Sequence, residues 1–337
     1  MFLVVAGITV DIHSHVVFPE AADMVAGLME PEDDPFTFYG GEKSNSYNAE
    51  HFRRLLPKMV GPDERLLDMD RMGIQIDALS IGPSQYYYWT EPSLGAELAE
   101  LQNDGMAGMV AAHPHRFVGM ATLPMQDVDR AVAELERVIS QHGFPGVSIN
   151  TNVNGKDYDH PDFLPFFAKA QELDITIVLH PNGFSGGERL SDYYLINVIG
   201  NPLDSTVAVS RLVFGGVLER FGDLKIVVVH GGGYLPFYSD RMDHAFEVRP
   251  ECREAISAKP SEYLRRLYFD TMVFGDTSLG YLVSRYGADH VLLGTDYPYD
   301  MGETDPIGLV KRVPGLSPTD VDMIKGGNAA RLLRLKD

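Results

Sequence analysis

Cysteine is almost absent from this 337-residue sequence, in which Cys252 is the only one. A single cysteine excludes an intrachain disulfide and any zinc site built from cysteine thiolates. Basic residues are also few: 28 Lys and Arg stand against 48 Asp and Glu, which gives a formal net charge of −20. We therefore expect no nucleic-acid partner and no anionic membrane surface, because both would repel the chain.

Long hydrophobic runs are missing as well. No stretch of about 18 uncharged apolar residues occurs, so no segment is predicted to span a membrane. The opening run Met1–Val10 is apolar, but it lacks a basic start and a small-residue cleavage site and continues directly into His13-Ser14-His15. We expect it to be a buried strand rather than a signal peptide, and the expected location is the cytoplasm.

What the sequence does have is a regular alternation of short apolar runs with helical segments. The chain is 45% hydrophobic, enough for a large core. Eight continuous apolar strands alternating with helices predict a parallel sheet covered on both faces, which closes into a TIM-like (β/α)8 barrel. The predicted strands are Leu3–Ile12, Ile76–Ile81, Phe117–Leu123, Gly146–Ile149, Thr176–Leu179, Lys225–Val229, Leu267–Phe269 and Val291–Leu293.

Helices are clearest where apolar residues recur with a period of 3.6, at Asp127–His142, Pro161–Leu173, Pro202–Phe221 and Pro318–Leu335. The segment 18–60 breaks this rhythm, because it is rich in Pro, Gly, Asn and acidic residues. We expect it to be a long loop inserted after the first strand, near the mouth of the barrel. The sequence is otherwise predicted to form one domain over residues 1–337.

Three of the apolar runs are followed by side chains that can bind a metal ion. The first run ends in His13-Ser14-His15, the fifth in His180 and the eighth in Gly294-Thr295-Asp296. The carboxyl ends of the strands of such a barrel meet on one face, so these side chains should converge. Two histidines that are two apart on a strand point to the same side. Three imidazoles and a carboxylate suit a single divalent ion, above all zinc.

His230 follows the sixth run and precedes three glycines, Gly231–Gly233. Glycines allow a close approach of the backbone, and we expect their amide N–H groups to be free for an anion. His230 is predicted to be a general acid or base that acts on the substrate. A fifth metal ligand or a purely structural histidine is the alternative.

Several short motifs carry a family resemblance that runs from about Asp11 to Leu333. The motifs are Asp11–His15, Tyr88-Trp89, Arg116–Gly119, Leu123–Gln126, Gly143–Val147, His230–Gly233 with Pro236-Phe237, and Leu293–Pro298 with Gly302-Glu303. Together they resemble the amidohydrolase superfamily, and within it the branch of aminocarboxymuconate semialdehyde decarboxylases. Resorcylate-type decarboxylases of the superfamily begin with Glu-x-His, so the His-x-His of this chain favours the carboxymuconate branch.

The resemblance implies roles for these residues. The metal ligands would be His13, His15, His180 and Asp296, holding one Zn²⁺ per chain, with Mn²⁺ or another divalent ion as the alternative. His230 would be the catalytic base, and Asp296 would also take part in catalysis.

The resemblance also implies how the substrate is held. Arg53 would bind a substrate carboxylate, and Arg241 would reach into the site of a neighbouring subunit, which implies a homodimer. Two arginines suit a dicarboxylate, because each guanidinium can hold a carboxylate through two hydrogen bonds.

Four further residues are candidates for contact with the substrate: Trp89, Tyr194, Asn197 and Tyr299. Two of them depart from the family pattern. Asn197 ends the run Tyr193–Asn197, where the family has a tryptophan, and Tyr299 stands where the family has a phenylalanine. An amide in place of a large apolar ring indicates that the substrate differs.

The resulting hypothesis is a zinc-dependent, non-oxidative decarboxylase, a carboxy-lyase that acts on an unsaturated or aromatic carboxylic acid in aromatic catabolism. A Lewis acid and a positioned acid/base supply the electron sink and the proton that the reaction needs. Whether hydroxide first adds to the substrate or Asp296 protonates carbon directly stays open. The alternative is a hydrolase or hydratase that acts on a lactone, an amide or an enoic diacid. A non-catalytic metal-binding protein is disfavoured, because all five key residues are retained.

Overall fold

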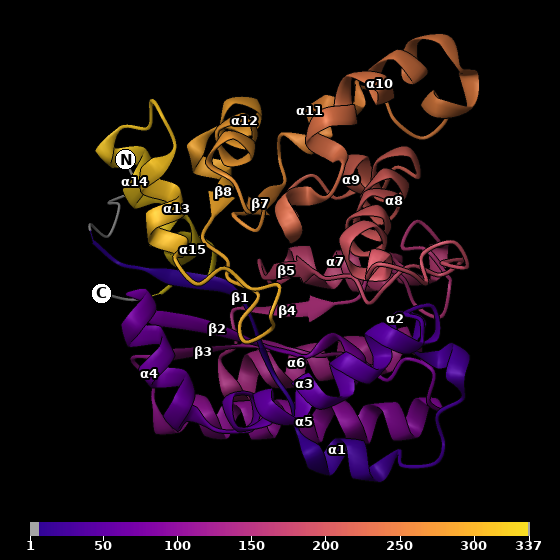
Figure 1. Ribbon diagram of the computed structural model, residues 1–337. Helices are drawn as coiled ribbons and strands as arrows, with labels where there is room; N and C mark the ends of the chain where they lie inside the picture. Colours follow the sequence, from indigo (N-terminus) through magenta and orange to yellow (C-terminus); the bar gives the residue numbers. More distant parts are fainter. Residues whose placement is uncertain (1–6, 336–337) are drawn as a thin grey trace.

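The computed structural model describes residues 7–335, and they form a (β/α)8 barrel (Figure 1). Eight parallel strands follow one another around the barrel in chain order. They are β1 Val10–Val16, β2 Ile76–Ile81, β3 Phe117–Ala121, β4 Gly146–Ile149, β5 Thr176–Leu179, β6 Lys225–Val228, β7 Tyr268–Asp270 and β8 Val291–Leu292. The ring closes through backbone hydrogen bonds from Ile12 N to Leu293 O at 3.0 Å and from His15 N to Tyr297 O at 2.8 Å. The predicted barrel is confirmed.

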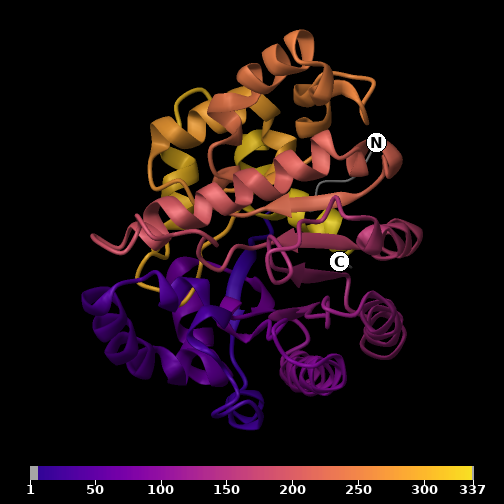
Figure 2. The same ribbon diagram turned by 90° about the vertical axis from the view of Figure 1, so that its right-hand side faces the viewer.

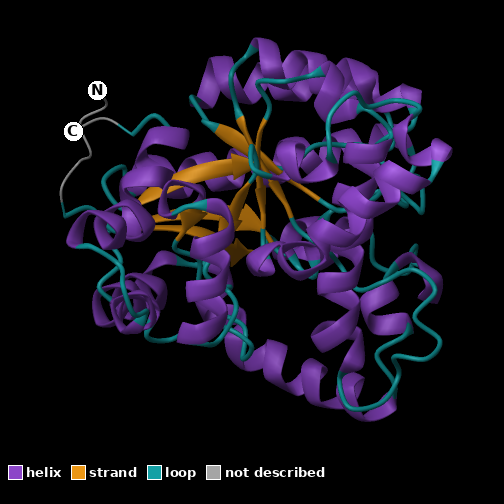
Figure 3. Ribbon diagram, turned by 90° about the horizontal axis from the view of Figure 1, so that it is seen from above, coloured by secondary structure: helices purple, strands orange, loops and turns teal. Residues whose placement is uncertain are grey.

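Helices surround the strands on all sides, as the view from above shows (Figure 3). In two perpendicular views the N-terminal helices and the C-terminal helices lie on opposite sides of the strands (Figures 1 and 2). The helices are α1 Pro19–Met24, α2 Pro35–Phe38, α3 Glu42–Val60, α4 Pro62–Met72, α5 Pro92–Ala112, α6 Val128–His142, α7 Leu164–Glu172, α8 Asn201–Phe214, α9 Val217–Arg220, α10 Leu235–Val248, α11 Pro260–Leu264, α12 Asp276–Tyr286, α13 Pro306–Arg312, α14 Pro318–Asp322 and α15 Asn328–Leu332.

The apolar strands bury both of their faces, which is why they are continuously hydrophobic. Alternate residues of β5 illustrate this: Ile177 and Leu179 belong to the large core beneath the helices, whereas Val178 belongs to a smaller cluster inside the barrel. Ala329 and Leu332 of α15 complete that inner cluster, and Thr176 Oγ1 at the start of β5 donates to Leu332 O at 3.1 Å. Helix α15 therefore closes the amino end of the barrel, and the opposite end is left for a site.

Strand β1 contains a bulge that aims its histidines. Asp11 pairs with Asp77 of β2 and Ser14 pairs with Leu79, so three steps on β1 match two steps on β2. An extra residue of this kind reverses the side to which later side chains point. Accordingly the even-numbered Ile12 packs inside the barrel, and above the bulge it is the odd-numbered His13 and His15 that point inward.

Some predicted boundaries differ from the structure. The first strand starts at Val10 rather than at Leu3 and extends to Val16, and the part of that prediction over residues 3–6 lies outside the described residues. The predicted helix Pro202–Phe221 is interrupted between α8 and α9, because Gly216 has a φ of 77° that ends the α-helical path. Residues 318–335 likewise form α14, a π-helical turn at Met323–Gly327 and α15.

The predicted loop over residues 18–60 is wrong, because most of that segment is helical. It contains α1, a 3-10 turn at Pro31–Asp33, α2 and the 19-residue α3. Helix α3 buries only Leu55 and Met59, which are four residues apart and so lie on one face. Its other face is polar and exposed, and it contains Pro57. A narrow apolar stripe with an internal proline gives a weak helical signal in a sequence.

Among the described residues, no helix has both the length and the apolar character that a bilayer crossing requires.

Candidate active site

Four histidines and one aspartate gather at the carboxyl end of the barrel. The Nε2 atoms of His13 and His15 lie 3.3 Å and 3.1 Å from Asp296 Oδ1. The His180 ring centroid is 4.9 Å from that of His13 and 4.7 Å from that of His15. Ligand atoms of His13, His180, His230 and Asp296 all lie within 4.8 Å of one another. The residues predicted from four separate strand ends are thus brought together in space.

The outer nitrogen of three of these histidines is held by the protein. His15 Nδ1 lies 3.2 Å from Ile81 O and His180 Nδ1 lies 2.7 Å from Pro181 O. A carbonyl oxygen only accepts, so each Nδ1 carries a hydrogen and each Nε2 presents a lone pair. His13 Nδ1 lies 2.6 Å from Asp270 Oδ2 and is oriented in the same way. The Nε2 atoms of His13 and His180 are buried and have no hydrogen-bond partner.

Lone pairs that converge on a carboxylate repel one another unless a cation lies between them, so the donor set fits a divalent metal ion. The electrostatics agree. Burial acts to lower the pKa of His13, but the carboxylates of Asp296 and Asp270 outweigh burial and raise that pKa to about 10. Burial and the neighbouring His15 lower the pKa of His180 well below its usual value, which keeps it a neutral ligand. The cluster therefore favours positive charge beside Asp296.

His230 is the most exposed histidine of the cluster. Its side chain is 14% exposed, whereas those of His13 and His15 are fully buried. His230 Nε2 lies 3.5 Å from Asp296 Oδ2, and the residue has a φ of 55°, a conformation that side-chain-bearing residues adopt rarely and often at functional sites. A histidine at the edge of the cluster can contact both Asp296 and a substrate.

The glycines after His230 do not provide a free anion site, and that prediction is wrong. Gly231 N donates to Asp270 Oδ1 at 2.7 Å, Gly232 N to Val229 O at 3.1 Å and Gly233 N to His230 O at 3.0 Å. All three amides are used because the chain turns tightly after β6. The glycines place His230 rather than bind a ligand.

Asp270 at the end of β7 is a site residue that the sequence analysis missed. Its carboxylate accepts hydrogen bonds from His13 Nδ1 and Gly231 N, so it positions both His13 and the turn that carries His230. Gly294 permits this arrangement, because a Cβ atom there would lie 3.0 Å from the Cβ atoms of both His13 and Asp270. An aspartate directly after the seventh apolar run was the available signal.

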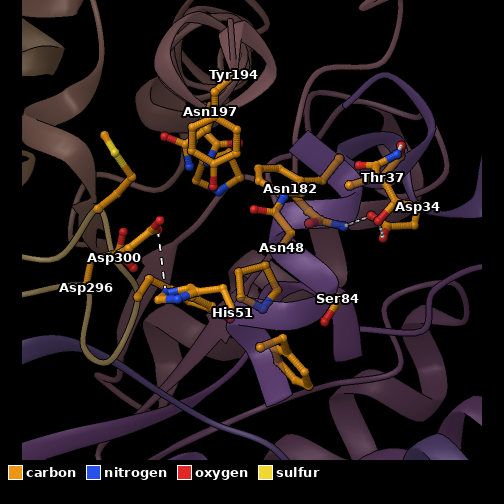
Figure 4. A pocket seen from close by; sticks show the side chains of 18 of the residues that line it. Asp34, Thr37, Asn48, His51, Ser84, Asn182, Tyr194, Asn197, Asp296 and Asp300 are labelled. Carbon is orange, nitrogen blue, oxygen red and sulfur yellow. Dashed lines mark hydrogen bonds and ion pairs between the residues drawn. The ribbon is translucent and has the colours of Figure 1, made fainter. Parts of the chain in front are cut away.

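A cavity of about 500 Å³ opens from the cluster to the surface (Figure 4). His180 and Asp296 form its inner end. Helices α2 and α3, from the segment after β1, cover it, and the chain after β8 supplies the opposite wall. The lining residues are Asp34, Phe36, Thr37, Asn45, Asn48, Ala49, His51, Phe52, Leu55, Pro83, Ser84, His180, Pro181, Asn182, Tyr194, Asn197, Asn201, Asp296, Tyr299, Asp300 and Met301.

The predicted substrate-binding residues divide into two groups. Tyr194, Asn197 and Tyr299 line this cavity, and the Tyr299 ring lies 5.2 Å from that of His15. Arg53 is exposed on α3 and Arg241 is exposed on α10, and neither lines the cavity.

The third residue outside the main cavity is Trp89. It lines a neighbouring cavity of about 450 Å³, and the two cavities share Asp34, Pro83, Ser84 and Asn182. Within one chain the structure therefore does not bring Arg53, Arg241 or Trp89 to the metal-binding cluster.

Two further lining residues were not recognised from the sequence: His51 on α3 and Asp300 after β8. His51 Nε2 lies 4.0 Å from Asp300 Oδ1, and the two side chains lie next to each other in the lining of the cavity (Figure 4). His51 stood in a polar segment that was interpreted as a loop, so nothing in its spacing indicated a partner. Asp300 lies four residues beyond Asp296, and that short separation was the available signal.

A parallel barrel with a buried histidine and carboxylate cluster at the carboxyl ends of its strands defines the class of metal-dependent (β/α)8-barrel enzymes. Comparison with known families agrees: the profile of the amidohydrolase family matches residues 10–335. The chain belongs to the amidohydrolase family, and the predicted resemblance is confirmed.

Several of the similar proteins are decarboxylases. The 2-amino-3-carboxymuconate-6-semialdehyde decarboxylase of Dictyostelium discoideum is 35% identical over 289 residues, which cover 86% of this chain and 80% of that protein. The solved structure of 5-carboxyvanillate decarboxylase from Sphingomonas paucimobilis has a TM-score of 0.86 at 27% identity, with 98% and 99% of the two chains covered. A dihydroxybenzoic acid decarboxylase from Polaromonas sp. JS666, solved with bound manganese and 2-nitroresorcinol, has a TM-score of 0.82 at 26% identity, with 97% of each chain covered.

Proposed function

We propose that this protein is a metal-dependent, non-oxidative decarboxylase of an aromatic or unsaturated carboxylic acid. The proposal rests on one observation: the Nε2 atoms of His13, His15 and His180 converge on Asp296. The rings keep this orientation because the protein holds each Nδ1. The relatives support the same reaction class, since those compared above are carboxy-lyases. The enzyme removes carbon dioxide without a redox change.

His13, His15, His180 and Asp296 would hold the ion, and zinc is the metal we propose for this nitrogen and oxygen donor set. A divalent ion bound there would supply a Lewis acid that stabilises negative charge on the substrate. For two of these ligands the protein itself favours the form that binds a metal. Burial lowers the pKa of His180 and so keeps its ring neutral, and the charge of His13 outweighs burial and holds the pKa of Asp296 well below its usual value.

Loss of carbon dioxide leaves an electron pair on carbon, and that carbon then needs a proton. His230 is the residue we propose to deliver it, because it is the cluster histidine with the most exposed side chain and it lies 3.5 Å from Asp296 Oδ2. Tyr299, beside His15, and helices α2 and α3 cover the inner end of the cavity. Reduced access of water there strengthens the electrostatic interactions that the reaction uses.

We also propose a homodimer in which Arg241 of one chain enters the cavity of its partner. Arg241 lies exposed on α10, which projects from the body of the molecule (Figure 1). The same helix exposes Phe237 by 62% and Tyr238 by 55%, and the Phe237 ring stacks on Tyr281 of α12 with centroids 4.5 Å apart. An exposed aromatic cluster of this kind is typical of a protein interface.

The function is tested by supplying muconate-like and hydroxybenzoic acids while ultraviolet absorbance and carbon dioxide are recorded together. A decarboxylase releases one carbon dioxide for each substrate consumed, and His13→Ala should abolish that release. Substrate consumption without carbon dioxide would instead identify a hydratase or hydrolase and overturn the proposal. Elemental analysis of the same preparation distinguishes zinc from manganese.

A further inference from the structure

The neighbouring cavity of about 450 Å³ that Trp89 lines, here called the Trp89 cavity, has no part in the reaction proposed above. It lies at the same end of the barrel as the metal-binding cluster, because Ser84 follows β2, Asn150 follows β4 and Asn182 follows β5. None of the four proposed metal ligands lines it, and neither does His230. A molecule bound in the Trp89 cavity would therefore meet chemical groups different from those of the cluster.

The Trp89 cavity contains a buried carboxylate that no cation neutralises. Asp204 on α8 is 7% exposed and lines the cavity. Its Oδ2 accepts from Thr151 Oγ1 and, at 3.3 Å, from Asn152 Nδ2, whereas no hydrogen bond within the described residues uses Oδ1. Burial, with a smaller contribution from the carboxylate of Asp157, raises the pKa of Asp204 to about 6. The group therefore still carries its charge at neutral pH.

The charges of the other lining residues have the same sign. All the lining residues lie in the described part of the chain, and none of them is a lysine, an arginine or a histidine. The acidic ones besides Asp204 are Glu32, Asp33 and Asp34. A buried carboxylate without a cationic partner opposes folding, and proteins retain such groups mainly where they bind or react. The charge of the cavity thus indicates a cationic ligand.

Aromatic side chains form another part of the wall. They are Tyr86, Tyr87, Tyr88 and Trp89. The rings of Tyr87 and Trp89 are nearly perpendicular, with centroids 6.2 Å apart. The face of an indole ring attracts an organic cation, whereas a metal ion prefers a shell of oxygen atoms. The volume of the Trp89 cavity also lies in the range typical of small organic ligands. These features favour an organic ammonium group over a metal ion.

We infer that the Trp89 cavity is a binding site for a small molecule with an organic ammonium group, which donates a hydrogen bond to Asp204 and contacts the indole ring of Trp89. The inference does not rest on the proposed function, because no residue of the metal-binding cluster takes part. It leaves the main cavity to the partner's Arg241. It also gives a binding role to Trp89, which the structure does not bring to the cluster.

Trp89 is the only tryptophan of the chain, so its fluorescence reports on this cavity. The probes are benzylamine, which is a cation at neutral pH, and benzyl alcohol, a neutral molecule of nearly the same shape. Each is titrated into the metal-loaded protein at constant ionic strength while the Trp89 emission is recorded. We expect benzylamine to bind at least about tenfold tighter than benzyl alcohol. Equal affinities, or no binding of either probe by fluorescence and by calorimetry, would overturn the inference.

Two variants assign the binding to the two residues. Asp204→Asn keeps the size of the side chain and an oxygen that can accept from Thr151, and it should weaken benzylamine binding at least about tenfold. Trp89→Leu, measured by calorimetry, should weaken it about 3- to 30-fold. Asp223→Asn is the matched control, because it removes an exposed carboxylate before β6, at the other end of the barrel. If Asp204→Asn or Trp89→Leu is folded by urea denaturation and binds benzylamine as this control does, the inference is wrong.

Two other cations are tested in the same assay. Calcium chloride is compared with sodium chloride of equal ionic strength, and only a metal site would let calcium displace benzylamine in a way that depends on Asp204. That result would overturn the inference. Arg241→Ala should bind benzylamine as the parent does, because the guanidinium is proposed to enter the main cavity. Tighter binding in Arg241→Ala would instead place the partner's guanidinium beside Asp204, and the site would not be one for a small molecule.

The ammonium group can belong to a separate molecule or to the substrate, since the two cavities share Asp34, Pro83, Ser84 and Asn182. Steady-state turnover of an acid that releases carbon dioxide, with and without benzylamine, distinguishes these sources. A raised KM with an unchanged kcat would assign the ammonium to the substrate, and an unchanged KM would assign it to a separate molecule. Binding of benzylamine that depends on Asp204, without carbon dioxide release from any acid, would support the inference and overturn the proposed function.

Discussion

His13 Nδ1 and Asp270 Oδ2 lie 2.6 Å apart, and neither side chain is accessible to solvent. This contact joins strand β1 to strand β7 across the closed part of the barrel. It fixes the His13 ring so that Nε2 faces Asp296, and the second oxygen of Asp270 holds Gly231 N at 2.7 Å. One carboxylate thus orients a proposed metal ligand and the turn that carries the proposed acid/base.

Asp270→Asn should therefore weaken metal binding by about 10- to 100-fold without unfolding the protein, because a carboxylate behind a ligating histidine raises its basicity and fixes its ring. The measurement is the metal dissociation constant, obtained by competition with a chelator. Asp223→Asn is the control and should bind metal as the parent does. Unchanged affinity in Asp270→Asn would mean that His13 is not a metal ligand.

His230→Ala should keep its metal and lose about 10²–10⁴-fold in rate, since an acid/base is needed for turnover and not for ligation. His15→Ala is the contrasting variant and should lose metal and activity together. The check is metal content by elemental analysis beside the steady-state rate. If His230→Ala loses the ion, His230 is a fifth ligand. Its ring nitrogen is close enough for that role, since it lies within 4.8 Å of ligand atoms of His13, His180 and Asp296.

Arg65 joins strands β1 and β2 beside the site, through a buried ion pair with Asp77 and a hydrogen bond to the backbone of His15. Its Nη1 donates to Asp77 Oδ2 at 2.7 Å, its Nη2 donates to the carbonyl of His15, and its side chain is fully buried. Arg65→Met should lower the free energy of unfolding by about 3–5 kcal/mol, because Asp77 would be left buried without its partner. Urea denaturation measures this.

Arg71→Ala is the control for this comparison. It removes a largely exposed arginine from the same helix, with a side chain 71% exposed and paired with Asp68, and should cost about 0–1 kcal/mol. Equal losses in the two variants would show that the Arg65–Asp77 pair contributes no more than a surface salt bridge.

The barrel could be predicted from the sequence because both faces of each strand are buried, which gives short continuous apolar runs such as Ile76–Ile81 and Thr176–Leu179 that the structure reproduces. The metal-binding cluster followed because the carboxyl ends of parallel strands meet. The bulge in β1 could not be predicted, since a pairing register depends on the neighbouring strand and leaves no mark in the local pattern.

The part of the cavity lining that α3 supplies was harder to predict for a related reason. Helix α3 is mostly polar, and only Leu55 and Met59 are buried along it. His51 gains its partner Asp300 from a segment about 250 residues away in the chain, a relationship that only tertiary packing creates. The same packing leaves Arg53 exposed although it is only two residues from His51.

The pH dependence of stability should report on Asp204, which lies on α8 and accepts from Thr151 Oγ1. Burial raises the pKa of Asp204 from 3.8 to about 6. Between these two pH values the folded state holds the proton of Asp204 more tightly than the unfolded state does. The contribution of Asp204 to the free energy of unfolding therefore falls by about 3 kcal/mol as the pH rises from about 4 to 6.

Asp204→Asn removes this contribution. The free energy of unfolding of the variant, relative to the parent, should therefore increase through that window. Denaturant titrations of both proteins at pH 4, 5, 6 and 7 test this, and parallel profiles would contradict it. The control Asp223→Asn should follow the parent at every pH.

The last prediction concerns assembly and uses Arg241, which is exposed on α10 and lies outside the cavity of its own chain. If Arg241 completes the pocket of a partner, Arg241→Ala and His230→Ala chains should each be inactive alone. A mixed dimer would contain one pocket with an intact His230 and an intact Arg241 supplied across the interface.

When equal amounts of the two chains exchange at random, about half of the dimers are mixed, and each mixed dimer has one working pocket of its two. About a quarter of all pockets are then complete, so the mixture should show about a quarter of the parent activity. Size-exclusion chromatography with differently tagged chains shows whether mixed dimers form. A mixture of His230→Ala and His15→Ala chains is the control and should stay inactive, because every pocket in it lacks either His230 or His15. Recovery in the Arg241 mixture alone places the guanidinium in the partner's cavity. No recovery, with mixed dimers present, would show that Arg241 acts within its own chain or lies outside every site, and the exposed aromatic cluster around Phe237 and Tyr281 would then need another partner.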